Sequence, residues 1–207
     1  MDQQINCPSC GAALKLKYHA SKMVVCNYCG QTSFLNADRW TAQGDKTVLA
    51  DYGSVLAVGR TGKIKDKPFT VLGRLRVTYS GGFWDEWLLQ KDDSTVAWLQ
   101  EDEGDFTLFV PTNFKGTLPD YLSVRVGQEL PLQDYPFFVM EKNQLKVQGG
   151  EGELPFQVVP GQPGAYVEGV AKGKPMSIEY LADETTLNRG TPVALAELKM
   201  DKQPDYV

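Results

Sequence analysis

Val71-Leu-Gly-Arg-Leu-Arg-Val-Thr-Tyr79 is the stretch that decides the fold class of this chain. Its apolar and polar side chains alternate, which is the two-residue period of a β-strand. The residues expected on its apolar face are Val71, Leu75, Val77 and Tyr79. Ser80-Gly-Gly82 then predicts a turn, and Phe83 to Leu89 is expected to return as the second strand of a hairpin.

Short apolar runs of the same kind continue along the chain and are separated by glycine and proline. They lie at 96–99, 106–110, 135–140, 144–148, 156–159, 165–170 and 176–180. No segment of ten residues or more shows the stripe of an amphipathic helix. We therefore predict an all-β domain.

The β region also resembles itself when it is shifted by 68 residues. Val58-Gly59 falls on Val126-Gly127, Val71 on Val139, and Trp98 on Tyr166. A related phrase, Gly190 to Leu195, is expected to close the second copy. This repeat predicts two similar units related by a pseudo-twofold axis, in a β-sandwich or barrel-like domain.

The four cysteines of the chain form two Cys-x-x-Cys pairs. These are Cys7-Pro-Ser-Cys10-Gly and Cys26-Asn-Tyr-Cys29-Gly. Paired hooks at this spacing are typical of a closed, four-thiolate structural zinc site, and two disulfides are the alternative. The glycine after each hook, Gly11 or Gly30, allows the backbone to turn. His19, the only histidine, is expected to be a turn residue, because four thiolates already complete the site.

A module this small cannot fold on apolar burial alone, so zinc binding should supply its folding free energy. The predicted organisation is a zinc ribbon at 1–36, a linker at 37–50, a duplicated β domain at 51–200 and a tail at 201–207.

Charge and composition restrict the classes of protein that fit. The net charge is −5 and the isoelectric point is about 5.0, which disfavours nucleic-acid binding. No apolar run approaches the roughly 20 residues of a membrane span, and no basic and apolar leader precedes the first hook. Reduced thiols with zinc then suggest a cytoplasmic protein.

The chain resembles a bacterial family that carries the domain of unknown function 4178. The resemblance rests on Val71 to Tyr79, on Trp84-Asp-Glu-Trp-Leu-Leu89, on Ala97-Trp-Leu-Gln-Glu-Asp102, and on the ending from Met176 to Leu198. It implies a bacterial protein without established catalytic residues, often encoded near polyamine-synthesis-like and small membrane-protein genes.

The usual catalytic constellations are absent from the sequence. The only histidine lies in the ribbon, and all four cysteines are assigned to the metal. Asp85 and Glu86 are adjacent on a strand and point to opposite faces, so they cannot act on one substrate atom. Glu101 to Glu103 are expected to form a solvated turn. We therefore expect no enzymatic activity.

The same region suggests a binding site for cations. Eight acids and one lysine lie between Asp85 and Asp105, interleaved with tryptophans. Tryptophan faces attract ammonium groups and carboxylates add charge, so a polyamine or a basic peptide would fit. The candidate residues are Trp84, Asp85, Glu86, Trp87, Trp98, Glu101 and Asp102. The alternative is that the tryptophans are core residues and the acids form a soluble surface.

Three functions follow from the sequence. The first is a non-enzymatic adaptor that binds another protein; the second is a sensor or carrier of small cations such as polyamines; the third and weakest is a nucleic-acid accessory factor.

Overall fold

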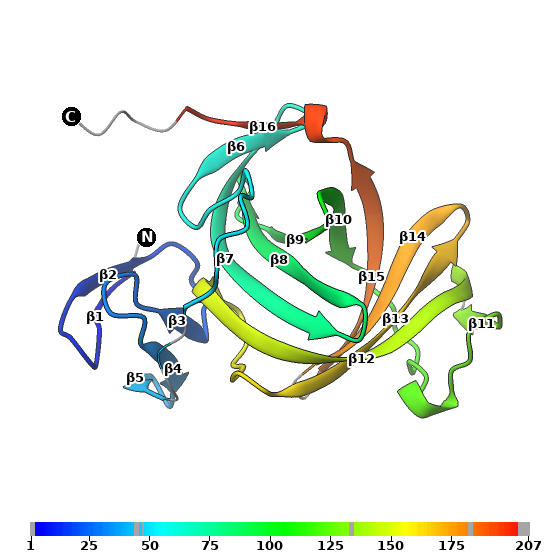
Figure 1. The fold of residues 1–207 in the computed structure, drawn as a ribbon, viewed down its shortest axis with the longest axis horizontal. Coiled ribbons are helices and arrows are strands. Elements are labelled where there is room, and N and C mark those ends of the chain that lie inside the picture. Colours follow the sequence, from blue (N-terminus) through cyan, green and yellow to red (C-terminus); the bar gives the residue numbers. More distant parts are fainter. Residues whose placement is uncertain (1–2, 44–45, 47, 133–134, 182–183, 203–207) are drawn as a thin grey trace.

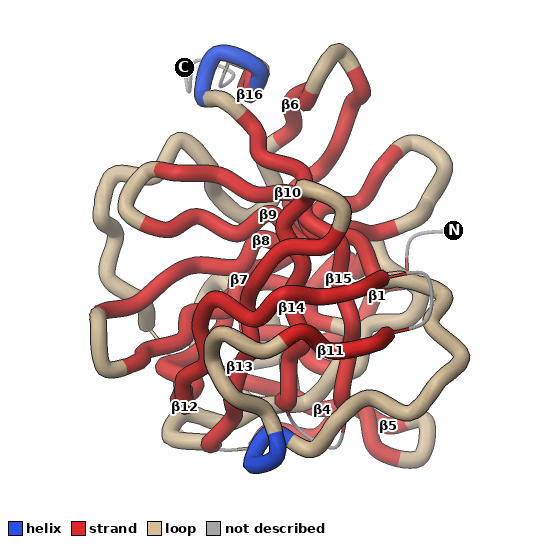
Figure 2. The backbone as a smooth tube through the Cα atoms, turned by 90° about the vertical axis from the view of Figure 1, so that its right-hand side faces the viewer, coloured by secondary structure: helices blue, strands red, loops and turns tan. Residues whose placement is uncertain are grey.

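The computed structural model describes residues 3–43, 46, 48–132, 135–181 and 184–202. Strands fill most of this length, and the two helical turns, η1 (Tyr121–Ser123) and η2 (Leu195–Glu197), lie at opposite ends of the molecule (Figure 2). The expected all-β class is confirmed. Neither helical turn in the described residues is long and apolar enough to cross a membrane.

Among the described residues, eight antiparallel strands close into a barrel (Figure 1). Around the wall they are β7 (Lys67–Tyr79), β8 (Gly82–Lys91), β9 (Val96–Asp102), β10 (Asp105–Pro111), β15 (Glu184–Val193), β14 (Lys174–Leu181), β13 (Pro163–Ala171) and β12 (Tyr135–Leu154). Pairing of β12 with β7 closes the ring. Two of the hairpins turn through residue–glycine pairs at positive φ, Glu103-Gly104 and Lys172-Gly173, as tight two-residue turns require.

The two halves of the barrel, β7–β10 and β12–β15, are related by a pseudo-twofold arrangement. Val71 accepts from the amide of Gly59, and Val139, 68 positions later, accepts from the amide of Gly127. Each half also has a β-bulge directly after this valine. Thr78 and Lys146, likewise 68 positions apart, are partners in the β7–β12 ladder, so the pseudo-axis passes beside them.

The predicted 68-residue register is wrong beyond this region. Val71 pairs with Leu89 whereas Val139 pairs with Gly169, so the equivalent strands β8 and β13 are 80 positions apart. The extra length lies in β12, which runs on to Leu154, and in the loop that follows it. Trp98 and Tyr166 are therefore not equivalent, and the phrase that begins at Gly190 lies in β15 and the turn after it.

Alternation sorts the wall residues into an inner and an outer face. Trp84 of β8 meets Tyr166 of β13 edge to face at 5.0 Å, although β7 and β12 separate these strands in the sheet. The two rings therefore meet across the barrel interior. Leu75, Val77 and Tyr79 share this inner face, but Val71 does not, because the bulge reverses the alternation.

Each half covers its own outer face. Three short strands contribute: β6 (Thr61–Ile64), β16 (Leu198–Met200) and β11 (Glu129–Leu132). Leu56, Ile64 and Leu198 pack over the outer face of the first half. Val124, Leu130 and Leu132 do the same for the second. Both faces of the wall are thus buried.

The N-terminal strands dock on one end of this barrel (Figure 1). They are β1 (Gln3–Asn6), β2 (Ala13–Leu16), β3 (Met23–Val25), β4 (Thr32–Asn36) and β5 (Arg39–Ala42), and β5 lies in the stretch expected to be linker. β3 pairs with the far end of β12. Met23, Val25 and Phe34 pack into the cluster that contains Leu75 and Val147, so the N-terminal module caps the barrel.

Candidate functional site

The two cysteine hooks have the same backbone geometry. In the first, the amide of Cys7 donates to Ala12 and that of Gly11 donates to Cys7. In the second, the amide of Cys26 donates to Gln31 and that of Gly30 donates to Cys26. Both glycines have positive φ, 76° and 72°, as the sequence predicted.

These hooks bring the four thiols to one point. All four Sγ atoms lie within 4.8 Å of one another, and the Cys7–Cys29 and Cys10–Cys26 pairs are 3.8 Å apart. That separation is too long for a disulfide. It equals the edge of a tetrahedron of thiolates with metal–sulfur bonds of about 2.3 Å.

The residues present therefore fit a four-thiolate metal ion. The backbone amide of Gln31 lowers the pKa of Cys29 to about 7, which favours the thiolate form. His19 is exposed and stacks edge-on against Tyr18, outside the thiol group. No thiol is left over for a substrate, so a bound metal would stabilise the module.

A buried carboxylate joins the cysteine module to the barrel. Glu153 of β12 accepts from the amides of Lys17 and Tyr18 and from the hydroxyl of Ser21, at 2.8 to 3.0 Å. It is 6% exposed. The 17–22 loop is thereby fixed over the barrel end, and two of its residues, Ala20 and Lys22, line the cavity described next.

The cavity, of about 550 Å³, opens at this end of the barrel. Its wall combines two carboxylates, Glu86 and Glu179, with a stacked aromatic pair, Trp98 and Phe156, whose ring centroids are 5.7 Å apart. Asn188 also lines it and donates to Glu179.

Further carboxylates continue this polar lining along the inner face. Glu168 of β13 accepts from Gln100 of β9, again across the barrel. Toward the other end, Asp102 is on the same face, and the exposed Glu141 accepts from the hydroxyl of Tyr166. None of the ion pairs of the described residues includes these interior acids.

Burial raises the pKa of four of these acids, none of which has an ion-pair partner among the described residues. Burial raises the pKa of Glu86 well above its ordinary range, and repulsion from Glu179 adds to the shift. Burial also raises the pKa of Glu179. For Glu168, burial and then nearby carboxylates raise the pKa to about 7, and burial raises that of Asp102.

The seven predicted tryptophan and acid residues do not form one site. Trp84, Glu86, Trp98 and Asp102 line the interior, with the indole of Trp84 donating to Glu86 at 2.9 Å. Asp85, Trp87 and Glu101 are on the outer face. Glu101 is not in a solvated turn, because it lies within β9 and accepts from Trp87 and Ser54.

The outer residues belong to a structural ion-pair cluster. Arg76, 0% exposed, donates twice to Asp85, at 2.7 and 2.5 Å, and once to the carbonyl of Ala50. The guanidinium lies 4.7 and 4.6 Å from the ring centroids of Tyr52 and Phe83. Asp85, one of the acids expected on a soluble surface, is thus buried and paired, whereas Asp92, Asp93, Glu103 and Asp105 are exposed.

Sequence reasoning missed Glu168, Glu179 and Asn188. Each lies on a strand of the second half that contains no tryptophan, and the predicted site rests on acids next to tryptophans. The signal available was an acidic or amide residue at an alternate position of a strongly apolar strand, as in Tyr166-Val-Glu168 and Ile178-Glu179.

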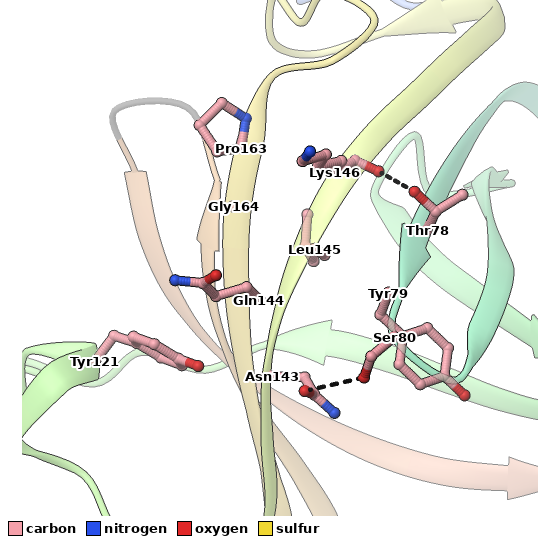
Figure 3. A pocket seen from close by; sticks show the side chains of 10 residues that line it. All are labelled: Thr78, Tyr79, Ser80, Tyr121, Asn143, Gln144, Leu145, Lys146, Pro163 and Gly164. Carbon is pink, nitrogen blue, oxygen red and sulfur yellow. Dashed lines mark hydrogen bonds between the residues drawn. The ribbon is translucent and has the colours of Figure 1, made fainter.

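A second hollow, of about 620 Å³, lies on the outside near the pseudo-axis. Figure 3 shows its residues on both sides of β12, with Tyr121 on one side and the Tyr79–Ser80 turn on the other. Asn143 and Ser80 approach to 3.5 Å across it. Aspartate and glutamate are absent from its lining.

The barrel region matches the sequence profile of one known protein family. The family profile described as "Domain of unknown function (DUF4178)" matches residues 57–195. The chain belongs to this family. The match begins just before β6 and ends at Leu195, so the DUF4178 region contains the whole barrel and leaves the cysteine module outside. No curated protein and no solved structure matches the chain.

The raised pKa of Glu168 in the DUF4178 barrel predicts a pH dependence of stability. An acid whose pKa rises on folding, here from 4.5 to about 7, contributes stability that is full below 4.5 and lost as the pH rises through 7. The free energy of unfolding should therefore fall between pH 5 and pH 8, and Glu168→Gln should flatten the slope and raise Tm at pH 8.

Urea unfolding at several pH values measures this effect, with Asp66→Asn as the control because Asp66 is an exposed acid outside the barrel. Parallel pH profiles for Glu168→Gln and the unmodified protein would contradict the assignment.

Proposed function

We propose that this protein is a non-enzymatic binding protein whose barrel holds a small organic cation. The observation that carries this proposal is the interior cavity, where Glu86 and Glu179 lie beside a stacked Trp98–Phe156 pair. Neither carboxylate has an ion-pair partner among the described residues. Carboxylates and aromatic faces together are the surroundings that ammonium groups prefer.

The spacing of the carboxylates favours an organic cation over a metal ion. Among the described residues, only the four cysteines bring three or more metal-ligating side chains within 4.8 Å of one another. Glu86, Glu168 and Glu179 are thus separate acidic groups, and a cation beside each would favour its ionised form. A polyamine, whose amines are spread along a chain, can pair with several of them at once.

The ligand test is thermal unfolding of the metal-loaded protein with spermidine, with magnesium chloride for comparison. Spermidine at about 100 times its Kd should add about 2.7 kcal/mol of stability. Glu86→Gln combined with Glu179→Gln should abolish the shift, and Asp66→Asn should retain it. Equal shifts in all three proteins would indicate counterion binding at the surface and would refute the cavity as the site.

The cysteine module is proposed to be a structural zinc ribbon of a cytoplasmic protein. Four thiolates with no open position suit zinc, and reduced thiols suit a reducing compartment. Iron would occupy the same tetrahedral sulfur set. Elemental analysis of the purified protein distinguishes the two metals.

An adaptor role is the second candidate function. The observation that favours it is the edge of β12 at 140–144, which pairs on one side with β13 and on its other side with no strand of the described residues.

A further inference from the structure

The pseudo-twofold arrangement has one unmatched position, on β12. In the first half, the β7 edge at 72–76 is covered by the β12 extension, where Gly149–Gly152 pair with Arg76 to Gly73. The equivalent edge of the second half is β12 at 140–144. A partner there would have to come from an extension of β7, but β7 ends at Tyr79 and turns.

Among the described residues, no strand consequently pairs with one side of the β12 edge at 140–144. Its other side is bonded to β13. Val139 marks the boundary toward β11, because it exchanges backbone hydrogen bonds with Gly127 and Gln128, and Leu145 marks the boundary toward β7. In Figure 1, β12 continues past the arrowhead of β7.

Side-chain exposure shows the same asymmetry. Leu72, on the covered edge, is 3% exposed, and Met140, its equivalent, is 59% exposed. Val58 is 38% exposed and its equivalent Val126 is 58% exposed. Phe138, one step along the strand, is also exposed. In the first half, the β12 extension therefore covers the β7 edge, whereas the equivalent β12 edge of the second half is exposed.

The surroundings of this edge are acidic. Glu141 lies within it, and the nearby β9–β10 hairpin carries Asp102, Glu103 and Asp105. Burial raises the pKa of Asp102, and repulsion from Glu103, Glu141 and Asp105 adds to the shift, so Glu141 lies close to Asp102. None of these four acids has an ion-pair partner among the described residues. The hollow of Figure 3 adjoins the edge at Asn143 and Gln144.

We propose that the β12 edge at 140–144 is a docking site for an extended segment of a partner protein in which apolar and basic residues alternate. The segment adds a strand beside β12, as the β12 extension does beside β7, and its backbone pairs with the free edge. Its apolar side chains cover Met140 and Val126, and its basic side chains pair with Glu141 and the acids of the β9–β10 hairpin.

The test uses three ten-residue peptides in which valine alternates with lysine, glutamate or serine. Hydrogen exchange and fluorescence anisotropy are measured with the full-length, metal-loaded protein. The lysine peptide should bind at least tenfold more tightly than the other two and should slow amide exchange at 140–144. The covered edge at 73–76 should already be protected without peptide.

Met140→Lys introduces a positive charge at the edge and should weaken binding of the lysine peptide at least tenfold. Val159→Lys is the matched control, because Val159 is an exposed valine in the loop after β12, and it should leave binding unchanged.

Failure of the lysine peptide to bind, or equal binding of all three peptides, would overturn the proposal. Concentration-dependent protection of 140–144 without peptide would also overturn it, since a second copy of the chain would then occupy the edge.

Discussion

Cys26→Ser should abolish metal binding and detach the cysteine module from the barrel. Structural metal sites of this kind contribute about 10–16 kcal/mol to the folding of small modules. The module's own core is only a few residues, Leu14, Leu16 and Val24 with the cysteines. Without the metal it has too little buried apolar surface to stay folded.

The barrel should survive this loss with its capped end loosened. Detachment removes Met23 and Phe34 from the cluster around Leu75 and leaves the buried Glu153 without its three donors. Strand content from 60 to 200 should persist by circular dichroism, while amide exchange at 150–158 accelerates. Tyr28→Ser is the control, because Tyr28 lies between two cysteines and is 71% exposed. Full metal content in Cys26→Ser would refute the site.

Asp85→Ala should be among the most destabilising single substitutions in the barrel. It leaves the guanidinium of Arg76 buried without its carboxylate, and breaking a buried pair in this way costs about 3–5 kcal/mol. Burial acts to lower the pKa of Arg76, and in the native protein Asp85 outweighs it. Because a guanidinium group stays protonated in proteins, the charge of Arg76 remains when Asp85 is removed. Urea unfolding measures the loss.

Two further variants separate charge from packing. Asp66→Ala removes an acid from the exposed pair with Lys199 and should cost at most about 1 kcal/mol. Arg76→Met combined with Asp85→Leu removes both charges and should recover much of the stability that Asp85→Ala loses. An Asp85→Ala cost no larger than that of Asp66→Ala would show that the buried pair is energetically unimportant.

The local features of this fold could be predicted from sequence because each depends on nearby residues. The cysteine hooks require only short spacing and a glycine, and the strand from Leu75 to Tyr79 requires only alternation. The 68-residue repeat holds through Lys146 because β6 and β11 have the same length and the first part of β12 matches β7. It fails afterwards because β12 runs on to Leu154, and no local sequence pattern marks where the equivalent strand β7 has already ended.

The interior site could not be predicted for a different reason. Alternation shows that Trp84 and Glu86 share one face and that Asp85 and Trp87 share the other, but it does not show which face is interior. Both faces are buried here, since Leu56 and its neighbours cover the outer one. The proximity of Glu86 to Glu179 depends on which distant strands face each other across the barrel. No short sequence pattern encodes that arrangement.

The docking of the cysteine module by Glu153 also has a consequence for synthesis of the chain on the ribosome. The module is complete within the first 43 residues, whereas the carboxylate that anchors Lys17 lies 136 positions further along. Metal can therefore be captured while most of the barrel is still untranslated. A metal-loaded module would then remain tethered to the growing chain until β12 is synthesised and pairs with it.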